Sequence, residues 1–433
     1  MVQRRIFSAT IAGIALTTLM VAGCSQDATS EPSNGSETSA TTEPVTITMW
    51  TRSVTAAQTE ALVERFNQEN TDEITVELTV VPFQEYLQKV SASASGGDLP
   101  DLVGANVIDG PNYSQLGLWT DISDRIDSLE SADSLAAAHL QAASFDGSTF
   151  AVPHVLDASA LFYNKVLFEQ AGLDPEDPPT TLEEVHEYAR AIDAISDDVG
   201  GLYFPGDCGG CLAFTVFPSM WAAGGTIMND DGTVGTLDSQ ASNDTFSIYN
   251  DMWNDGSMIA ESRNENGATQ NEAFASGTAG FALLGSKALG TIAENENLKI
   301  GVTPIPGPGG GTSTFVGGDV VGIASSSKNP DAAWKFIEWT LSEQIQMEEY
   351  VAKGFMPVRT DLAENEFSAQ DERVLLFNTL VSEGNTPYSV RFFQTFNDPQ
   401  GPWLSLVRGA VFDEGPAGLL ASNEQVTSSL QDS

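Results

Sequence analysis

The sequence predicts an α/β fold with a mostly parallel sheet, and two kinds of hydrophobic pattern carry this prediction. Residues 45–50 and residues 74–81 alternate apolar and polar side chains, as half-buried strands do. Residues 55–70 and a stretch that ends at Gly96 instead repeat apolar side chains at helical spacing. With residues 101–103 as a third short strand, the order strand, helix, strand, helix, strand places helices on both faces of a parallel sheet.

Later segments contain clear helix signals. Thr180 is in position to cap a helix that begins near Leu182, with Glu183 returning the bond. The dipeptide Asn329-Pro330 predicts the start of a long helix that ends at Gly354. These signals continue the α/β pattern through the rest of the chain.

The composition excludes several classes of protein. The chain has 433 residues, more than one compact core usually holds, and a 41% hydrophobic fraction that excludes a wholly disordered chain. Its 18 Lys and Arg against 60 Asp and Glu give a net charge of −42. That balance excludes nucleic-acid binding through a broad basic surface and disfavours docking on anionic lipid through protein charge. With 3 His residues there is little material for a metal site, and we expect neither metal nor cofactor.

The N-terminus has the layout of an export signal. Two arginines precede an apolar run over residues 6–21, which ends in Val21-Ala22-Gly23-Cys24. These four residues resemble the lipobox of bacterial lipoproteins, in which the Cys receives a diacylglycerol. The resemblance implies a lipoprotein signal peptide over residues 1–23 and lipidation of Cys24. An ordinary signal with an incidental Cys is the alternative.

Residues 24–44 are rich in Ser, Thr and Glu and hold no aromatic residue, so they cannot bury a core. We expect a disordered tether that reaches roughly 25 Å. No later stretch approaches the ~20 apolar residues of a transmembrane helix. The body is therefore expected outside the cytoplasm, anchored to the cell membrane by its N-terminal lipid alone.

A series of short motifs extends over most of the chain. They are GGDLPD at 96–101, FDGSTFAVP at 145–153, LFYNK at 161–165, PPTTLEE at 178–184, GGD at 317–319, SKNPDAA at 327–333 and FMPVR at 355–359. In order and spacing these motifs resemble those of the extracellular solute-binding proteins of carbohydrate ABC importers, the group that includes maltose-binding protein.

The resemblance implies a periplasmic-binding-protein-like fold of two α/β lobes, joined by three crossing segments near residues 154–159, 315–321 and 356–359. Lobe 1 would comprise residues 45–155 and 320–357, and lobe 2 residues 156–319 and 358–433. A ligand in the interlobe cleft would drive hinge closure as a population shift. The implied protein is a monomeric receptor that captures a mono- or oligosaccharide, delivers it to an ABC permease and performs no chemistry.

Sugar hydroxyls pair with carboxylates, amides and guanidinium groups, and sugar C–H faces pack on aromatic rings. Trp50 and the loop of residues 106–112 are expected at the mouth of the sheet, beyond the carboxyl ends of its strands. Asp157 falls at the family's acidic ligand-binding position, whereas Lys287 stands where maltose-binding protein has an aromatic residue. The candidate ligand-binding residues are Trp50, Asn106, Asp109, Asp157, Phe217, Trp221, Lys287, Asp319, Trp403 and Arg408.

Several of these candidates have a plainer structural role as an alternative. Phe217, Trp221 and Trp403 could fill the core, as about half of the aromatic residues in such a chain do. Asp109 and Lys287 could be solvated surface charges. Asp157 could cap a turn, although it is the strongest of the candidates.

The motif Cys208-Gly209-Gly210-Cys211 contains the two cysteines that remain once Cys24 is assigned to the lipid. An even pair in an oxidising compartment predicts a disulfide between Cys208 and Cys211. A thioredoxin-type redox motif is the alternative. A single CxxC cannot supply the four ligands of a Cys₄ zinc site.

Common catalytic motifs are absent: the sequence has no Gly-x-Ser-x-Gly, no His-Glu-x-x-His and no Gly-x-x-x-x-Gly-Lys-Ser/Thr. A glycosidase needs only two carboxylates, so a secreted carbohydrate-active enzyme is an alternative function. A surface adhesin and an importer-type receptor for a non-sugar solute, such as a polyol phosphate, are others. The acidic net charge disfavours a phosphate ligand unless Lys287 and Arg408 line the cleft.

Overall fold

The computed structural model describes residues 44–432, with the backbone only of residues 83 and 84. The predicted signal peptide, Cys24 and all but the last residue of the predicted tether lie outside the described residues. The described chain folds around one eight-stranded sheet in the order β2-β1-β3-β12-β6-β8-β7, and β9 also pairs with β6. No helix in this part of the chain is long and apolar enough to cross a membrane.

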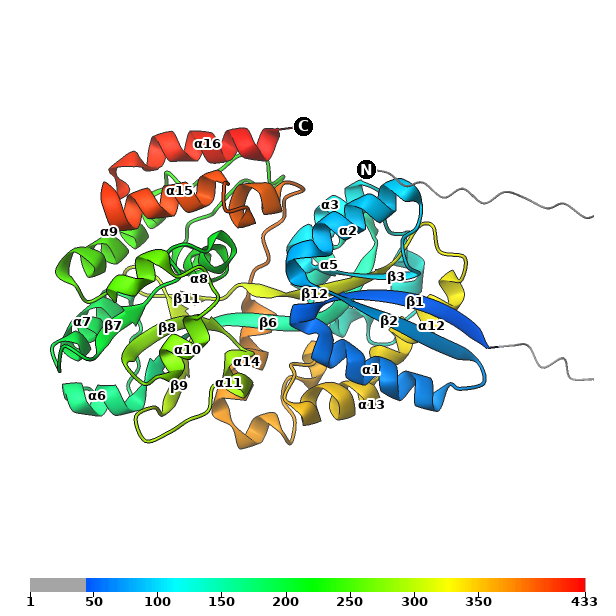
Figure 1. Ribbon diagram of the computed structural model, residues 1–433, viewed down its shortest axis with the longest axis horizontal. Helices are drawn as coiled ribbons and strands as arrows, with labels where there is room; N and C mark the ends of the chain where they lie inside the picture. Colours follow the sequence, from blue (N-terminus) through cyan, green and yellow to red (C-terminus); the bar gives the residue numbers. More distant parts are fainter. Residues whose placement is uncertain (1–43, 433) are drawn as a thin grey trace, which may run out of the picture. The chain divides into compact units, whose positions relative to one another are not determined.

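The first three strands run parallel, as the sequence predicts. β1 (Val45–Arg52) lies between β2 (Ile74–Val81) and β3 (Leu102–Asn106). α1 (Ala56–Glu69) and α2 (Phe83–Gly96) connect these strands and cover opposite faces of the sheet (Figure 1). Each helix packs an apolar stripe against the sheet. The spacing of apolar residues that predicts each helix therefore also identifies the face that contacts the sheet.

Two long strands carry the sheet from the first lobe into the second (Figure 1). β6 (Ala151–Asn164) pairs through its first half with β12 (Val316–Ile323), and through its second half with β8 (Ala279–Gly285) and β9 (Ile300–Thr303). β12 pairs in turn with β3 of the first lobe, antiparallel. β6 and β12 are therefore two crossing segments; β6 contains the first expected crossing, residues 154–159, and β12 contains all but the first residue of the second, residues 315–321.

The third passage between the lobes lies later in the chain than residues 356–359. The N–H of Ala136 donates to the carbonyl of Val358 at 3.1 Å, and Arg359 forms a β-bridge with Leu135, so this segment still packs on the first lobe. The next long helix, α14 (Glu372–Glu383), packs on β6 and β9 of the second lobe. These main-chain contacts place residues 358 and 359 with the first lobe, whereas the predicted boundary places them in the second.

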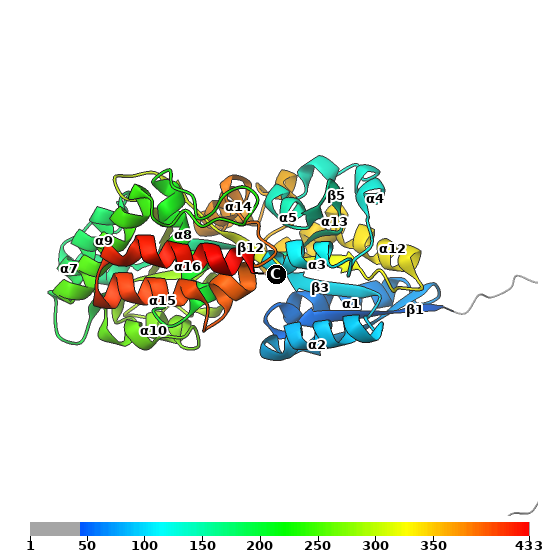
Figure 2. The same ribbon diagram turned by 90° about the horizontal axis from the view of Figure 1, so that it is seen from above.

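The second lobe contains β7 (Gly200–Tyr203), which pairs with β8 in parallel, and a layer of helices on each side. Its helices are α6 (Lys165–Ala171), α7 (Leu182–Asp193), α8 (Gly209–Ala222), α9 (Gln240–Asp255), α10 (Gln270–Ala275), α11 (Ala288–Thr291), α15 (Pro402–Arg408) and α16 (Leu419–Gln431). Figure 2 shows α15 and α16 side by side on one face of this lobe.

The remaining helices of the first lobe are short. They are α3 (Gly110–Gln115), α4 (Ser123–Asp127), α5 (Ala137–Ala142), α12 (Pro330–Thr340) and α13 (Glu343–Ile345). α12 begins at Pro330 as predicted but ends well before Gly354, and separate helical turns follow it. The apolar stripe of the segment continues through these turns, so the stripe alone could not show where the α-helix ends.

The cap of α7 lies one residue later than the sequence predicts. The Oγ1 of Thr181 accepts from the N–H of Glu184 at 3.0 Å, and Glu184 accepts from the N–H of Thr181 at 3.2 Å. The capping box is therefore Thr181 with Glu184 rather than Thr180 with Glu183. The sequence Thr-Thr-Leu-Glu-Glu offers both registers, and the position of the buried Leu182 selects the second.

Candidate ligand-binding site

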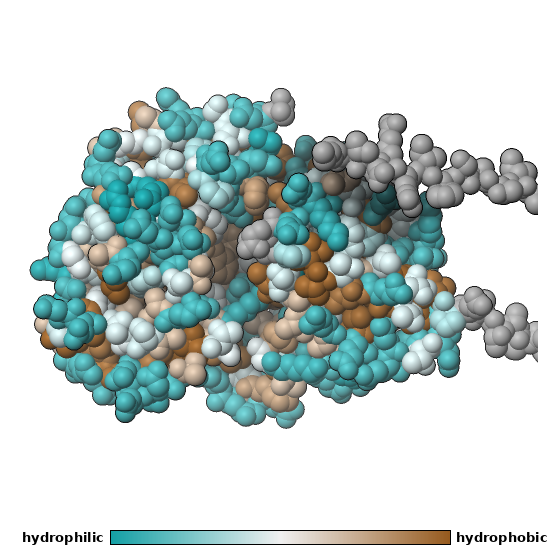
Figure 3. All heavy atoms as spheres, in the orientation of Figure 1, coloured by the Kyte–Doolittle hydropathy of each residue, from teal (hydrophilic) through white to brown (hydrophobic). Residues whose placement is uncertain are grey.

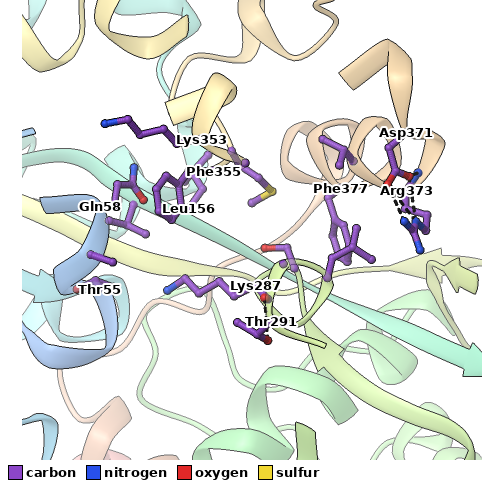
Figure 4. Close-up of a pocket in the computed structure, with 18 of the residues that line it drawn as sticks. Thr55, Gln58, Leu156, Lys287, Thr291, Lys353, Phe355, Asp371, Arg373 and Phe377 are labelled. Carbon is purple, nitrogen blue, oxygen red and sulfur yellow. Dashed lines mark hydrogen bonds and ion pairs between the residues drawn. The ribbon is translucent and has the colours of Figure 1, made fainter. Parts of the chain in front are cut away.

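A cavity of about 500 Å³ lies between the two lobes, and we call it the interlobe pocket. Figure 3 shows the surface hollowed between the lobes, and Figure 4 shows the side chains that line the pocket. The first lobe lines it with Val54, Thr55, Ala57, Gln58 and residues 353–356. The crossing strand β6 contributes Val155 and Leu156, and the second lobe contributes residues 286, 287, 289–291, 371, 373, 374 and 377.

A buried ion pair holds the first-lobe wall of the pocket. Arg52, the last residue of β1, donates from Nε to Oδ2 of Asp319 on β12 at 3.2 Å, and its Nη2 pairs with the other carboxylate oxygen. Thr55, which lines the pocket, donates its hydroxyl to Asp319 Oδ2 at 2.6 Å. Burial alone would raise the pKa of Asp319, but the Arg52 guanidinium and the Thr55 hydroxyl outweigh it and lower that pKa. The ionised pair fixes the loop after β1 to the second crossing segment.

Asp157 ties the second-lobe wall to β6. Its Oδ1 accepts from the backbone N–H of Ser286 at 2.9 Å and from the Ser286 hydroxyl at 2.7 Å. A Cβ on Gly285 would lie 2.8 Å from Asp157 Oδ1, so glycine permits this close approach. The other oxygen, Oδ2, makes no hydrogen bond to a described residue, which leaves it available as an acceptor next to the lining residue Ser286.

Three cationic side chains and one carboxylate line the pocket. Arg373 and Asp371 pair through two donors, from Nε to Oδ1 at 2.9 Å and from Nη2 to Oδ2 at 2.8 Å. Lys353 pairs with Glu349, which is not part of the lining. Lys287 has no ion-pair partner within 4.0 Å among the described residues, and its side chain extends toward the Thr55 side of the pocket (Figure 4).

Two aromatic rings that are not among the predicted ligand-binding residues line the pocket. Phe355 comes from the segment before the third crossing and Phe377 from α14. Ring faces of this kind suit the C–H faces of sugars. Phe355 lies in the FMPVR motif, which predicts a crossing segment and gives no signal for ligand contact. Phe377 ends an apolar run over residues 374–377, a pattern that carries no signal for ligand contact.

Three predicted residues of the first lobe lie outside the pocket lining. Trp50 is half-buried in β1, and Lys89 Nζ lies 4.3 Å from the centroid of its ring. Asn106 caps the turn after β3 by accepting from a backbone N–H two residues later at 3.4 Å. Asp109 interacts with Arg52; burial raises the pKa of Asp109 to about 7, although the Arg52 charge opposes the rise.

Phe217 and Trp403 lie in the core of the second lobe rather than against the pocket. Both are 0% exposed, and their ring centroids are 4.9 Å apart, with Phe396 packed against both rings. α8 and α15 are in direct contact here, because Trp403 Nε1 donates to the carbonyl of Gly209 at 3.1 Å. Trp221 is the half-buried member of this cluster, 5.8 Å from Phe217 between ring centroids. The core alternative therefore holds for Phe217 and Trp403.

Arg408 is also engaged outside the pocket lining. It pairs with Asp207 at 3.0 Å and donates to the carbonyl of Arg263 at 2.7 Å, which holds the end of α15 against neighbouring loops. Of the predicted ligand residues, only Lys287 lines the interlobe pocket. Asp157 and Asp319 each hydrogen-bond to a lining residue.

Cys208 and Cys211 are joined in a disulfide at the start of α8. Cys208 is the residue before the helix, and its Sγ accepts from the N–H of Cys211 at 3.2 Å. Neither cysteine lines the interlobe pocket, so the disulfide acts on the end of a helix and not on the site. Among the described residues, no group of three or more His, Cys, Asp or Glu side chains could hold a metal ion.

A model of the bacterial extracellular solute-binding protein family matches residues 61–375. The chain belongs to this family. A binding protein of Brucella abortus (strain 2308) is 28% identical over 333 residues, which are 75% of this solute-binding protein and 78% of the relative. The diacetylchitobiose binding protein DasA of Streptomyces coelicolor is 26% identical over 290 residues, 64% of this chain and 65% of that one.

The crystal structure of the cyclic α-maltosyl-1,6-maltose binding protein from Arthrobacter globiformis superposes on this solute-binding protein with a TM-score of 0.77. The two share 22% identity, and the match covers 90% of this chain and 100% of the other. This likeness confirms the two-lobed fold that the sequence motifs imply. The relatives and the structural neighbour are named as binding proteins and not as enzymes.

Proposed function

We propose that this protein is the extracytoplasmic receptor of an ABC importer, and that it captures a mono- or oligosaccharide in the interlobe pocket and delivers it to the membrane permease. The observation that carries the proposal is a single cavity lined by both lobes and by β6, which joins them. The names of the relatives, a diacetylchitobiose binder and a cyclic maltosyl-maltose binder, support a carbohydrate ligand.

A ligand in this pocket would act on the relative population of open and closed lobes. It would contact Thr55 and Gln58 on one side and Ser286 and Lys287 on the other, so it binds best when both walls are close. A ligand shifts such an equilibrium only by its difference in affinity for the two states, and contacts to both lobes supply that difference. The permease would then distinguish loaded from empty receptor by shape, with no chemical step.

Attachment to the membrane is part of the same proposal. We infer that the signal peptide is removed at Cys24, that the Cys24 thiol is lipidated, and that residues 24–44 act as a tether. A receptor tethered in this way stays near its permease while the body moves freely over roughly 25 Å. It requires no second subunit, so the receptor acts as a monomer.

A thermal-shift assay of the mature chain against a panel of mono- and oligosaccharides tests the proposal. A bound sugar at a hundredfold excess over its Kd adds about 2.7 kcal/mol to the free energy of unfolding, which raises the melting temperature measurably. The release of sugar fragments on long incubation would instead favour the secreted carbohydrate-active enzyme. Stabilisation by no sugar in the panel would contradict a carbohydrate receptor.

A further inference from the structure

The side chains that line the interlobe pocket carry more positive than negative charge, unlike the chain as a whole. Lys287, Lys353 and Arg373 line it against the single carboxylate of Asp371, whereas the whole chain has 18 Lys and Arg against 60 Asp and Glu. Carboxylates in or next to the lining pair with Lys353 and Arg373, so the preference of the pocket for a negative ligand depends on the remaining cation, Lys287.

The acidic groups at the pocket are already occupied by donors of the protein. Asp371 accepts from the backbone N–H, Nε and Nη2 of Arg373, and Asp319 accepts from Arg52 and Thr55. Asp157 Oδ1 accepts twice from Ser286, whereas its Oδ2 accepts no hydrogen bond from a described residue. A neutral sugar presents many hydroxyl donors, and this site offers few free carboxylate oxygens to receive them.

The cationic groups are occupied too, with one exception. Arg373 has Asp371 and Glu294 as partners, and Lys353 has Glu349. Among the described residues, Lys287 has no ion-pair partner within 4.0 Å. Its ammonium has three donors, and its neighbours along the pocket wall include apolar side chains such as Leu289 and Leu156.

Resting on the proposed function, we propose that the ligand is an anionic saccharide or polyol, and that Lys287 pairs with its carboxylate or phosphate group. The Lys287 ammonium makes no ion pair within 4.0 Å among the described residues, so it can pair with one negative charge, such as the one that a uronic acid carries. The aromatic rings of Phe355 and Phe377 receive the sugar ring, and Asp157 Oδ2 accepts from one hydroxyl. Lys287 then sets specificity, because a neutral sugar would leave its ammonium unpaired in the closed pocket.

The test is a calorimetric titration of the mature chain with matched pairs of ligands. The pairs are galacturonate and galactose, digalacturonate and galactobiose, glucuronate and glucose, and sn-glycerol 3-phosphate and glycerol. We expect at least one anion to bind more than tenfold more tightly than its neutral partner, with an affinity that falls as salt concentration rises. The carboxylate and phosphate pairs show which group supplies the charge.

Substitution of Lys287 gives the second readout. Lys287→Gln should weaken the best anion by about tenfold to a hundredfold and leave the neutral partner within about twofold. Lys335→Gln is the matched control, because Lys335 lies on α12, outside the pocket lining, with a side chain 62% exposed. It should change neither affinity.

The outcomes separate this inference from the proposed function. Tighter binding of the neutral partners, insensitive to Lys287→Gln, overturns the anionic ligand and leaves a carbohydrate receptor in place. Tight binding of an anion that Lys287→Gln does not weaken overturns the role of Lys287. No binding by any member of the four pairs overturns the anionic ligand, and a neutral panel sugar that stabilises the chain would still support the carbohydrate receptor.

Discussion

Arg52 and Asp319 form a buried ion pair that joins the end of β1 to the crossing strand β12 across 267 residues of sequence. Their side chains are 7% and 0% exposed, so neither charge is compensated by water. The pair also receives the hydroxyl of Thr55, a lining residue of the interlobe pocket. The geometry of one pocket wall therefore depends on a contact between distant parts of the chain.

Removal of one partner of this pair should destabilise the fold strongly. Asp319→Leu removes the carboxylate that is hydrogen-bonded to the buried Arg52 guanidinium, and we expect a loss of about 3–5 kcal/mol in the free energy of unfolding. The double variant Arg52→Met with Asp319→Leu should recover most of that loss. Urea unfolding at neutral pH measures all three changes.

The exposed pair between Arg125 and Asp331 is the control for this prediction. Its side chains are 31% and 91% exposed, and Arg125→Met should cost less than about 1 kcal/mol. Equal losses for the buried and the exposed pair would contradict the role assigned to Arg52 and Asp319.

Two buried histidines should make the fold less stable as pH falls. Burial lowers the pKa of His139 and of His154 to about 4 in the folded chain, below the value of about 6.5 in an unfolded one. The unfolded chain thus binds protons first, so the contribution of each histidine is complete above about pH 6.5 and is lost as pH falls toward 4. Between about pH 6.5 and 4.5 the loss is on the order of 2 kcal/mol per histidine.

A variant without one of these groups isolates the effect. His154→Gln retains a side chain that can hydrogen-bond Thr59, which now lies 3.0 Å from the His154 Nε2. Its stability should fall less steeply with acid than that of the wild type in urea unfolding at several pH values. Parallel pH curves for the two proteins would contradict a lowered pKa at His154.

Asp157 is expected to matter for ligand binding more than for folding. Asp157→Ala removes the acceptor of Ser286 and the free Oδ2, and we expect binding of the best ligand to weaken by about tenfold to a hundredfold. Gly285→Ala should weaken binding as well, because its Cβ would meet Asp157 Oδ1 at 2.8 Å. Calorimetric titration of both folded variants measures these losses. Wild-type affinity in both would remove Asp157 from the site.

The disulfide between Cys208 and Cys211 should contribute little to stability. It closes a very short loop, and a 15-residue loop already contributes only about 3 kcal/mol, so replacement of both cysteines by serine should cost less than that. Peptide mass spectrometry should find the two residues linked in protein purified under oxidising conditions. Two free thiols there, or a larger loss of stability, would count against this assignment.

The local parts of the fold could be predicted from the sequence, and the site could be predicted only in part. β1, β2, α1 and α2 follow from alternation and helical spacing, because the residues that define them are neighbours in the chain. The aromatic side chains of Phe217 and Trp403 look alike in sequence whether they face a ligand or a core. The contact between α8 and α15 shows that these rings face the core. Residues nearly two hundred positions apart in the chain make that contact.

The pocket lining shows the same limit. The position of Lys287 in a motif predicts a place in the cleft, but it does not show that Asp371, Glu349 and Glu294 pair with other cations of the described chain. Phe377 gave no sequence signal at all. Such residues can be identified only from the tertiary structure, because segments from both lobes form the pocket and no local sequence pattern predicts which segments meet.

The most direct test of the central claim compares calorimetric titrations of Phe355→Ala and Trp50→Ala with the best saccharide. Phe355 lines the interlobe pocket, whereas Trp50 is an aromatic residue of the first lobe outside it. A half-covered ring contributes roughly 1–2 kcal/mol of apolar burial at about 25 cal/mol per Å². Phe355→Ala should therefore weaken binding about tenfold, and Trp50→Ala should leave it within about twofold of the wild type. The reverse result, with Trp50→Ala weakened and Phe355→Ala unchanged, would place the ligand elsewhere and contradict the account.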